Sequence, residues 1–205
     1  MSGFLTRRRY DPVKRLLDLT ITFAAAPVLV PLLGLCAAAI AIDSPGPVLF
    51  QQPRTGRDGR PFVIYKFRTM AKNAEEMKKS LQHLSIVPYP DFKLIDDPRI
   101  TRVGRFLRKS SLDELPQIWN VVRGDMSLVG PRPTSFAPET YDLWHARRLE
   151  VRPGLTGLWQ ITGRNTTDFD ERSRLDDQYI RTRSLGLDLK ILMRTIPEML
   201  RQRGH

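Results

Sequence analysis

The longest hydrophobic stretch in the chain is an apolar run from Leu19 to Ile42. A straight helix of this length would extend roughly 36 Å at ~1.5 Å per residue, which is enough to cross a bilayer. Pro27 lacks an amide proton and clashes with the preceding turn, and Pro31 follows one turn later. We therefore predict a membrane helix that bends sharply at Pro27.

Basic residues lie on both sides of this run, so the positive-inside rule places both of its ends in the same compartment. This favours a re-entrant helix hairpin over residues 1–43, followed by a domain over residues 44–205 on the cytoplasmic face. A kinked transmembrane helix is the alternative, and a cleaved signal peptide fits less well because residues 40–43 form a poor cleavage site. The basic residues are Arg7, Arg8, Arg9, Lys14 and Arg15 before the run and Arg54, Arg57, Arg60, Lys66 and Arg68 after it.

Shorter patterns after the apolar run predict an α+β domain that is mainly helical. Val48–Gln52 and Pro61–Phe67 are β-type runs, and the turn-rich segment Arg54–Gly59 between them favours a β-hairpin. Helices are predicted over residues 71–82, 100–107 and 111–124.

A further helix is indicated near the C-terminus by a hydrophobic stripe at helical spacing. Such a stripe usually packs on a core. In a basic, membrane-associated chain it can instead lie along the bilayer surface as an amphipathic interfacial helix. The stripe comprises Leu185, Leu189, Leu192, Ile196 and Met199.

The chain carries a formal net charge of +11, which implies an anionic partner. For a chain with a membrane segment, the leading candidates are anionic lipid headgroups and phosphorylated substrates. Cys36 is the single cysteine and lies inside the apolar run, so a disulfide framework and a thiolate metal site are excluded.

The candidate chemistry centres on two adjacent carboxylates, Asp113 and Glu114, near the start of the helix predicted over residues 111–124. One interpretation is purely local: Ser111 and Glu114 have the spacing of a capping box, and Asp113 suits the positive end of the helix dipole. The other is catalytic, because adjacent carboxylates can supply a magnesium ligand and a nucleophile that attacks phosphorus.

Phosphoryl chemistry requires cations near the carboxylates. Arg108 lies just upstream of the pair, and Arg132 stands between two prolines that restrict its backbone. An arginine in an ordinary surface turn would look the same. The segment Val151–Asn165 combines three glycines with two arginines, a weak phosphate-binding pattern that has neither the P-loop nor the dinucleotide-binding spacing.

Four blocks of the sequence together resemble the signature blocks of bacterial sugar transferases, the monotopic phosphoglycosyl transferases. The blocks are Lys66–Met70, Ser111–Gln117, Gly124–Pro133 and Val151–Gly157, and they occur in the family's order. The resemblance extends from Tyr10 to Arg201. It indicates a minimal member, without the additional N-terminal helices and accessory domain of larger relatives.

This resemblance implies transfer of a sugar 1-phosphate from a UDP-sugar to undecaprenyl phosphate, with release of UMP, at the cytoplasmic face of the bacterial inner membrane. The product would enter glycoconjugate or exopolysaccharide synthesis. By the same resemblance Asp113 is the nucleophile and a Mg²⁺ ligand, and Glu114 assists it. Substrate-binding residues implied in this way are Lys66, Arg68, Arg108, Arg132, Arg152, Gly154, Thr156, Gly157, Arg164 and Asp176.

Two other functions remain as alternatives to the transferase. A basic adaptor at the membrane surface would need no catalysis and would make the carboxylate pair merely structural. A nucleic-acid-binding protein would use the positive charge but would leave the apolar run and the carboxylate pair unexplained, so we expect no nucleic-acid partner. The sequence does not identify the sugar or the role of residues 71–98, and it leaves a homodimer open.

Overall fold

The computed structural model describes residues 2–85, 94, 96–134, 145–162 and 169–201. The protein is mostly helical, as predicted, and has a small antiparallel hairpin. In chain order the elements, with 3-10 turns labelled η, are α1 (Ser2–Asp43), β1 (Leu49–Thr55), η1 (Arg57–Gly59), β2 (Pro61–Phe67), α2 (Ala74–Leu81), η2 (Gln82–Leu84), α3 (Arg102–Lys109), η3 (Leu112–Gln117), α4 (Ile118–Arg123), β3 (Ser127–Val129), η5 (His145–Glu150), β4 (Gly154–Thr156), α5 (Leu158–Thr162), α6 (Phe169–Thr182) and α7 (Leu185–Arg201).

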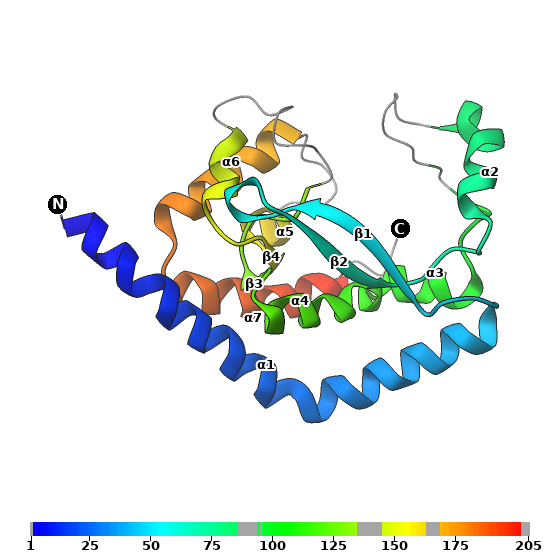
Figure 1. Ribbon diagram of the computed structural model, residues 1–205, viewed down its shortest axis with the longest axis horizontal. Helices are drawn as coiled ribbons and strands as arrows, with labels where there is room; N and C mark the ends of the chain where they lie inside the picture. The colour runs from blue at the N-terminus through cyan, green and yellow to red at the C-terminus, as the bar shows by residue number, and fades with distance from the viewer. Residues whose placement is uncertain (1, 86–93, 95, 135–144, 163–168, 202–205) are drawn as a thin grey trace.

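Helix α1 contains the apolar run and continues through Pro12, Pro27 and Pro31. Figure 1 shows it sharply bent near its middle, so that its two arms form a V. Its residues Tyr10–Asp43 are long and apolar enough to cross a membrane, and only 11% of their most apolar window is buried. Large apolar side chains along α1 therefore remain exposed, as expected of a helix whose surroundings are lipid: Phe23, Val28, Val30, Leu35 and Ile42.

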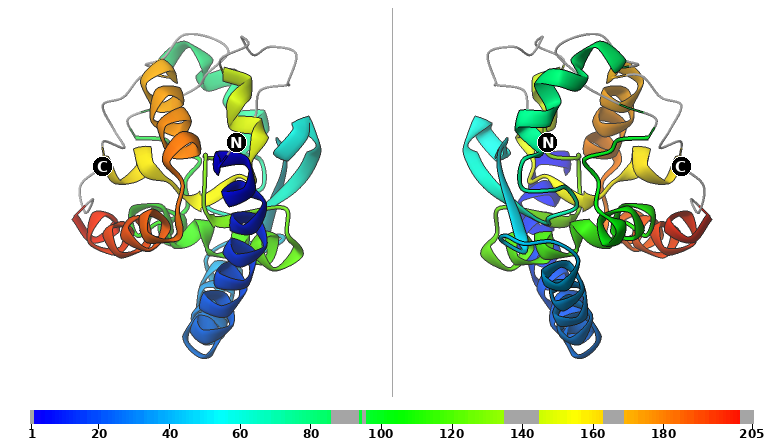
Figure 2. Two further views of the ribbon diagram at one scale, coloured as in Figure 1. Left: turned by 90° about the vertical axis from the view of Figure 1, so that its left-hand side faces the viewer. Right: turned by 90° about the vertical axis from the view of Figure 1, so that its right-hand side faces the viewer.

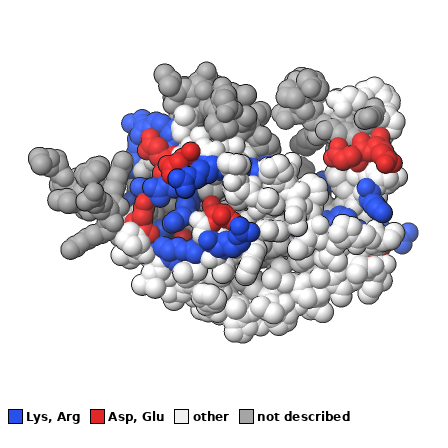
Figure 3. Space-filling view, viewed as in Figure 1, with Lys and Arg blue, Asp and Glu red and all other residues white. Residues whose placement is uncertain are grey.

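The rest of the described chain, which we call the body, holds both arms of α1 (Figure 2). In the first arm, Asp18 accepts a 2.6 Å hydrogen bond from the Ser127 hydroxyl. In the second arm, Cys36 and Ile40 pack with buried residues of β2 and α3. Helix α1 thus leaves the body and returns to it, and in Figure 3 the surface over its bend shows no charged side chains.

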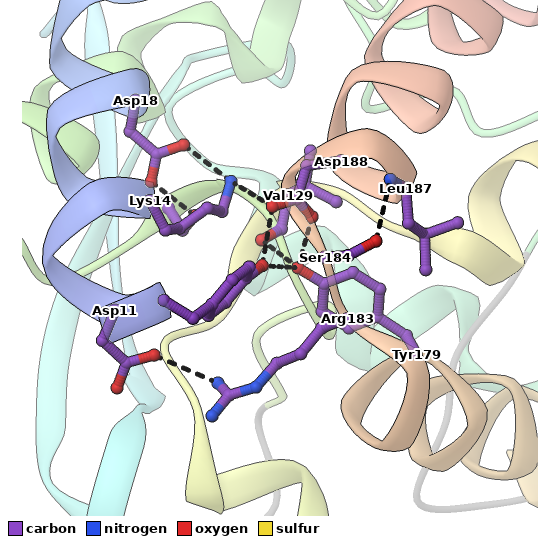
Figure 4. A network of polar contacts seen from close by, with 11 residues as sticks. Asp11, Lys14, Asp18, Val129, Tyr179, Arg183, Ser184, Leu187 and Asp188 are labelled. Carbon is purple, nitrogen blue, oxygen red and sulfur yellow. Dashed lines mark hydrogen bonds and ion pairs between the residues drawn. The ribbon is translucent and has the colours of Figure 1, made fainter. Parts of the chain in front are cut away.

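A buried polar network fastens the first arm to α6 and α7 (Figure 4). The Asp188 carboxylate, fully buried, accepts hydrogen bonds from Tyr10 at 2.6 Å and from Tyr179 at 2.8 Å. Lys14 bridges the Asp18 and Asp188 carboxylates at 2.7 and 3.4 Å. Removing one partner of a buried ion pair costs roughly 3–5 kcal/mol, because the other charge is left buried and unpaired. Any movement that separates these groups is therefore costly, and the network fixes the position of this arm on the body.

Strands β1 and β2 form the predicted antiparallel hairpin, paired from Leu49 with Phe67 to Thr55 with Pro61. The free edge of β2 is satisfied by a side chain from α4. Asn120, which has no exposed surface, donates to the Val63 carbonyl at 2.7 Å and accepts from the Tyr65 amide at 3.2 Å. The hairpin and α4 are therefore joined through one buried amide.

A second sheet pairs β3 with β4 in parallel, which the sequence patterns do not predict. Each strand has only three residues, too few for a periodic signal. A Cβ at Gly130 or Gly154 would overlap the neighbouring backbone, so glycine permits the close approach of the two segments.

The core lies between β2, α4, β3, α6 and α7, around Val121, Met126 and Ile191. On α7 the buried face differs from the predicted stripe, because Ile191 is fully buried whereas Leu189 and Ile196 are exposed. For these two stripe residues, packing on the core is therefore the wrong interpretation.

Candidate active site

A cleft of about 770 Å³ opens between the hairpin, α2, the α3–η3 segment and α5. Asp113, Glu114, Lys66, Arg108 and Arg132 line it, so the fold brings both carboxylates and the three principal cations of the sequence prediction together. The convergence depends on tertiary packing, because these residues come from β2, α3, η3 and the segment after β3.

The carboxylate pair does not sit in a capping box. Ser111 is in the left-handed region, with φ 56°, and its side chain makes no cap hydrogen bond. The predicted helix over residues 111–124 is split into η3 and α4, since Pro116 lacks the amide proton that an α-helix would need there. The capping-box interpretation is thus wrong, and both carboxylates are available for other contacts. The helix does end at Gly124, in the left-handed conformation, as predicted.

Glu114 is neutralised by two cations. Lys66 contacts its carboxylate at 2.7 Å, and Arg132 grips both of its oxygens, one of them at 3.1 Å. Burial disfavours ionisation, but the charges and hydrogen bonds of Arg132 and Lys66 outweigh it and lower the pKa of Glu114 to about 2. Glu114 is therefore an ionised anchor that positions both cations.

Asp113 is in the opposite situation. Its carboxylate forms no hydrogen bond or ion pair with any residue that the structure describes. Burial and the neighbouring Glu114 charge raise its pKa, against the lowering influence of Lys66, Arg108 and Arg132. Asp113 is thus the uncommitted and more basic carboxylate of the pair, which is what a nucleophile requires.

Arg108 is oriented by a hydrogen bond from its Nε to the Thr69 hydroxyl, at 2.8 Å. Helix α3, which carries Arg108, is capped at its N-terminus by Thr101, whose hydroxyl accepts from the Gly104 amide at 3.0 Å. Gly104 packs directly on the Thr69 backbone, since a Cβ there would overlap the Thr69 carbonyl oxygen. Sequence reasoning did not single out Thr69, although it lies inside the block Lys66–Met70.

Arg68 also lines the cleft, but its donors are largely engaged at the end of α1. It donates to the Pro45 carbonyl at 2.9 Å and to the Ser44 carbonyl at 2.7 Å. Gly46 lies against this guanidinium with φ 123°, a conformation that favours glycine. Arg68 therefore ties the membrane helix to β2 beside the cleft.

Asp176 lies outside the cleft but contacts the Arg132 segment through Arg148. The Arg148 guanidinium donates to Asp176 at 2.6 Å and to the Arg132 carbonyl at 3.3 Å. Burial raises the pKa of Asp176, with Arg148 opposing the shift. The pair supports the backbone from which Arg132 reaches Glu114, and no sequence motif pointed to Arg148.

Four further predicted binding residues of the described chain do not line the cleft. Arg152 lies beside the polar network of Figure 4, and Gly154, Thr156 and Gly157 belong to β4 or its end, packed against Gly130 and α7. Arg164 lies outside the described residues.

Binding of Mg²⁺ in this cleft would require ligands from the substrate in addition to the protein. Among the described residues, no group of three or more His, Cys, Asp or Glu side chains could hold a metal ion. Mg²⁺ often binds through one or two carboxylates together with substrate phosphates and water. The uncommitted Asp113 carboxylate, beside cations that would hold phosphates, fits that arrangement.

The sequence is similar to those of known proteins. A sequence model of the bacterial sugar transferase family matches residues 9–202, and the chain belongs to this family. Galactosyl transferase CpsE of Streptococcus agalactiae is 52% identical over 76% of this chain and 35% of its own length. Undecaprenyl-phosphate galactose phosphotransferase of Salmonella typhimurium is 42% identical over 98% of this chain and 43% of its own length.

UDP-glucose:undecaprenyl-phosphate glucose-1-phosphate transferase of Caulobacter vibrioides is 45% identical over 97% of this chain and 73% of its own length. The chain thus spans less than half of the first two relatives and most of the third.

Proposed function

We propose that this protein transfers a sugar 1-phosphate from a UDP-sugar to undecaprenyl phosphate. The observation that carries the proposal is the division of roles between adjacent carboxylates: Glu114 holds two cations, while Asp113 faces them without a partner among the described residues. A non-catalytic adaptor has no need of a half-buried, unpaired carboxylate in a cleft, since partial burial of an unpaired charge is costly. The names of the relatives support the donor and acceptor classes.

In the proposed reaction, an Asp113 oxygen attacks the phosphorus that bears the sugar. The bond from this phosphorus to the bridging oxygen breaks, and UMP leaves with the electron pair. An oxygen of undecaprenyl phosphate then attacks the same phosphorus and releases the Asp113 carboxylate, which predicts ping-pong kinetics. Lys66, Arg108 and Arg132 stabilise the negative charge of the phosphates during both displacements. Bound Mg²⁺, held by Asp113 and phosphate oxygens, would add further charge neutralisation.

We also infer that the cleft stands at the cytoplasmic surface of the bacterial inner membrane. The two arms of α1 return to the same body, which supports a re-entrant helix instead of a crossing. Helices α3, α4 and α7 lie at the level where α1 leaves the body in Figures 1 and 2. Their exposed apolar side chains suit an interfacial position: Phe106, Trp119, Met193 and Ile196.

The acceptor can approach along an apolar side of the cleft. Leu49 and Phe50 line the cleft just after the end of α1, and both are about half exposed. A prenyl chain in the bilayer would pass these side chains before its phosphate reaches the cations. This arrangement supports a lipid acceptor over a soluble one.

The covalent intermediate gives the sharpest test. Purified protein in nanodiscs, with Mg²⁺, is mixed with a panel of UDP-sugars in the absence of acceptor, and its intact mass is measured. We expect one sugar phosphate to be added to the wild-type protein and none to Asp113→Asn, which lacks the attacking charge. UMP release upon addition of undecaprenyl phosphate should fall by at least ~10³-fold in that variant.

Asp58→Asn, at an exposed carboxylate outside the cleft, serves as the matched control and should react normally. Near-normal transfer by Asp113→Asn would refute the covalent route. Absence of UMP release from every UDP-sugar in the wild-type protein would refute the activity.

A further inference from the structure

One wall of the cleft has no part in the phosphate chemistry. It is formed by the first turn of α2 and the residues before it, of which Ala71, Lys72, Ala74 and Glu75 line the cleft. Figure 1 places α2 and α5 on opposite sides of the segment that joins α3 to α4 and carries Asp113. A donor whose phosphates lie at Asp113 therefore extends one of its ends toward α2 and the other toward α5.

The α5 side has the character of a site for a planar group. Trp159 lines the cleft there, and the Arg172 guanidinium lies 5.4 Å from the centre of its ring. The indole Nε1 is buried and has no hydrogen-bond partner among the residues that the structure describes. Aromatic and guanidinium planes stack on nucleobases, so this side suits the uridine of the donor.

The α2 side has the character of a site for hydroxyl groups. Apart from Asp113 and Glu114, Glu75 is the one carboxylate that lines the cleft within the described part of the chain. A carboxylate repels phosphates but accepts hydrogen bonds from neutral hydroxyls, and the Lys72 ammonium beside it can donate them. In Figure 3 the acidic surface at the right, over α2, lies above a few basic side chains and apart from the other acidic groups on this face.

The turn that carries Glu75 is held in place by a buried ion pair. Arg99 contacts Asp97 at 2.6 Å and donates to the Ala74 carbonyl at 3.2 Å, while its own carbonyl accepts from the Ala71 amide at 2.9 Å. Both charged groups of this pair are buried. The wall is therefore built on a fixed backbone, as a site that distinguishes similar ligands requires.

We propose that Glu75, assisted by Lys72, binds hydroxyl groups of the transferred sugar and determines which UDP-hexose is used. This inference rests on the proposed function and gives a role to part of the segment 71–98. It addresses a choice that overall similarity leaves open, because relatives of comparable identity are named for galactose and for glucose. A site that hydrogen-bonds a substrate hydroxyl discriminates strongly against ligands that cannot satisfy it.

The test compares Glu75→Gln with Glu76→Gln. Both glutamates lie in the first turn of α2, where either favours the helix dipole, but only Glu75 lines the cleft. The rate constant kcat/KM for UMP release is measured in nanodiscs with undecaprenyl phosphate and UDP-glucose, UDP-galactose and their N-acetylhexosamine counterparts. Inhibition by UDP, which lacks the sugar, is measured in parallel and also reports that the nucleotide site is folded.

We expect Glu75→Gln to change the ratio of kcat/KM between the best two sugars by about tenfold or more, the effect of losing one charged hydrogen bond. Inhibition by UDP should be unchanged, Glu76→Gln should match the wild type, and Lys72→Met should alter the sugar ratio in a folded protein.

Unchanged sugar ratios in Glu75→Gln and Lys72→Met, with an active wild type, would overturn this inference alone. Weaker UDP inhibition in Glu75→Gln would place the nucleotide at α2 and also overturn it. An inactive wild type would overturn the proposed function and this inference with it.

Discussion

Asp113 and Glu114 are neighbours in sequence and share one cleft, yet their ionisation equilibria shift in opposite directions. The difference comes from their partners. Lys66 and Arg132 form ion pairs with Glu114, whereas they act on Asp113 only through longer-range electrostatic attraction. Two groups of the same chemistry are thereby separated into a carboxylate that holds two cations and the carboxylate that we propose as the nucleophile, and such opposite shifts are typical of catalytic sites.

The opposite pKa shifts of Asp113 and Glu114 predict how activity depends on pH. The Glu114 charge raises the pKa of Asp113, so Glu114→Gln should lower that pKa by removing the neighbouring anion and freeing the charges of Lys66 and Arg132. In the proposed mechanism activity requires ionised Asp113, so activity should be lost as pH falls through the pKa of Asp113. We expect the acid limb of the kcat/KM profile of Glu114→Gln, at reduced overall rate, to lie at lower pH than that of the wild type. An unmoved or raised acid limb would show that another group controls it.

At the scale of elements, helix α3 packs through Gly104 against the backbone of Thr69, two residues after the end of β2. Helix interiors usually gain from Gly→Ala, but at Gly104 the added methyl group would meet the Thr69 carbonyl. Thr69 also orients Arg108, so a shift of α3 away from Thr69 would displace a guanidinium that lines the cleft.

We therefore expect Gly104→Ala to destabilise the protein by about 2 kcal/mol or more and to reduce activity. Gly186→Ala on α7, where nothing lies within 4 Å of the new methyl group, is the matched control and should be neutral or stabilising by up to ~1 kcal/mol. Thermal unfolding in detergent and UMP release measure the two effects. Equal stability of the two variants would contradict the proposed contact.

The sequence predicted the elements that have a local pattern of residues, but it did not predict those that depend on contacts between distant segments. The hairpin follows from two β-type runs around a turn, and α4 ends at the predicted Gly124. By contrast, β3 and β4 pair across a long separation with three residues each. The same limit applied to the site: residue type and motif indicated Arg132 beside the carboxylates, but the engagement of Arg68 by the turn after α1 depends on tertiary packing.

At the scale of the whole molecule, α1 is joined to the body at both ends. Besides the network of Figure 4, Arg15 donates to the Val122 carbonyl at 2.8 Å and to the Val121 carbonyl, at the end of α4. Helix α4 directly follows the segment that carries Asp113. Helix α1 is therefore connected to the segment that carries Asp113 through direct packing on α4.

The prolines of α1 should control its topology. In Pro27→Leu/Pro31→Leu we expect a straighter helix, because each leucine restores an amide donor and removes a clash. Reporters at residue 1 and after residue 205 should both be cytoplasmic in the wild type, while the variant should place the N-terminal reporter outside. An external N-terminus in the wild type would show that α1 crosses the bilayer.

The bend in α1 also limits how deeply the protein can act. In the proposed orientation, a bend at Pro27 divides the apolar run into 8 and 16 residues, or ~12 and ~24 Å along the two arms, against a hydrocarbon thickness of ~30 Å. The shorter arm limits the depth of the bend to less than the ~15 Å of one leaflet, so the near leaflet would be the one displaced by protein. Catalysis would draw its acceptor from, and return its product to, that single leaflet, so delivery of the finished lipid to the other side must belong to a separate transport step.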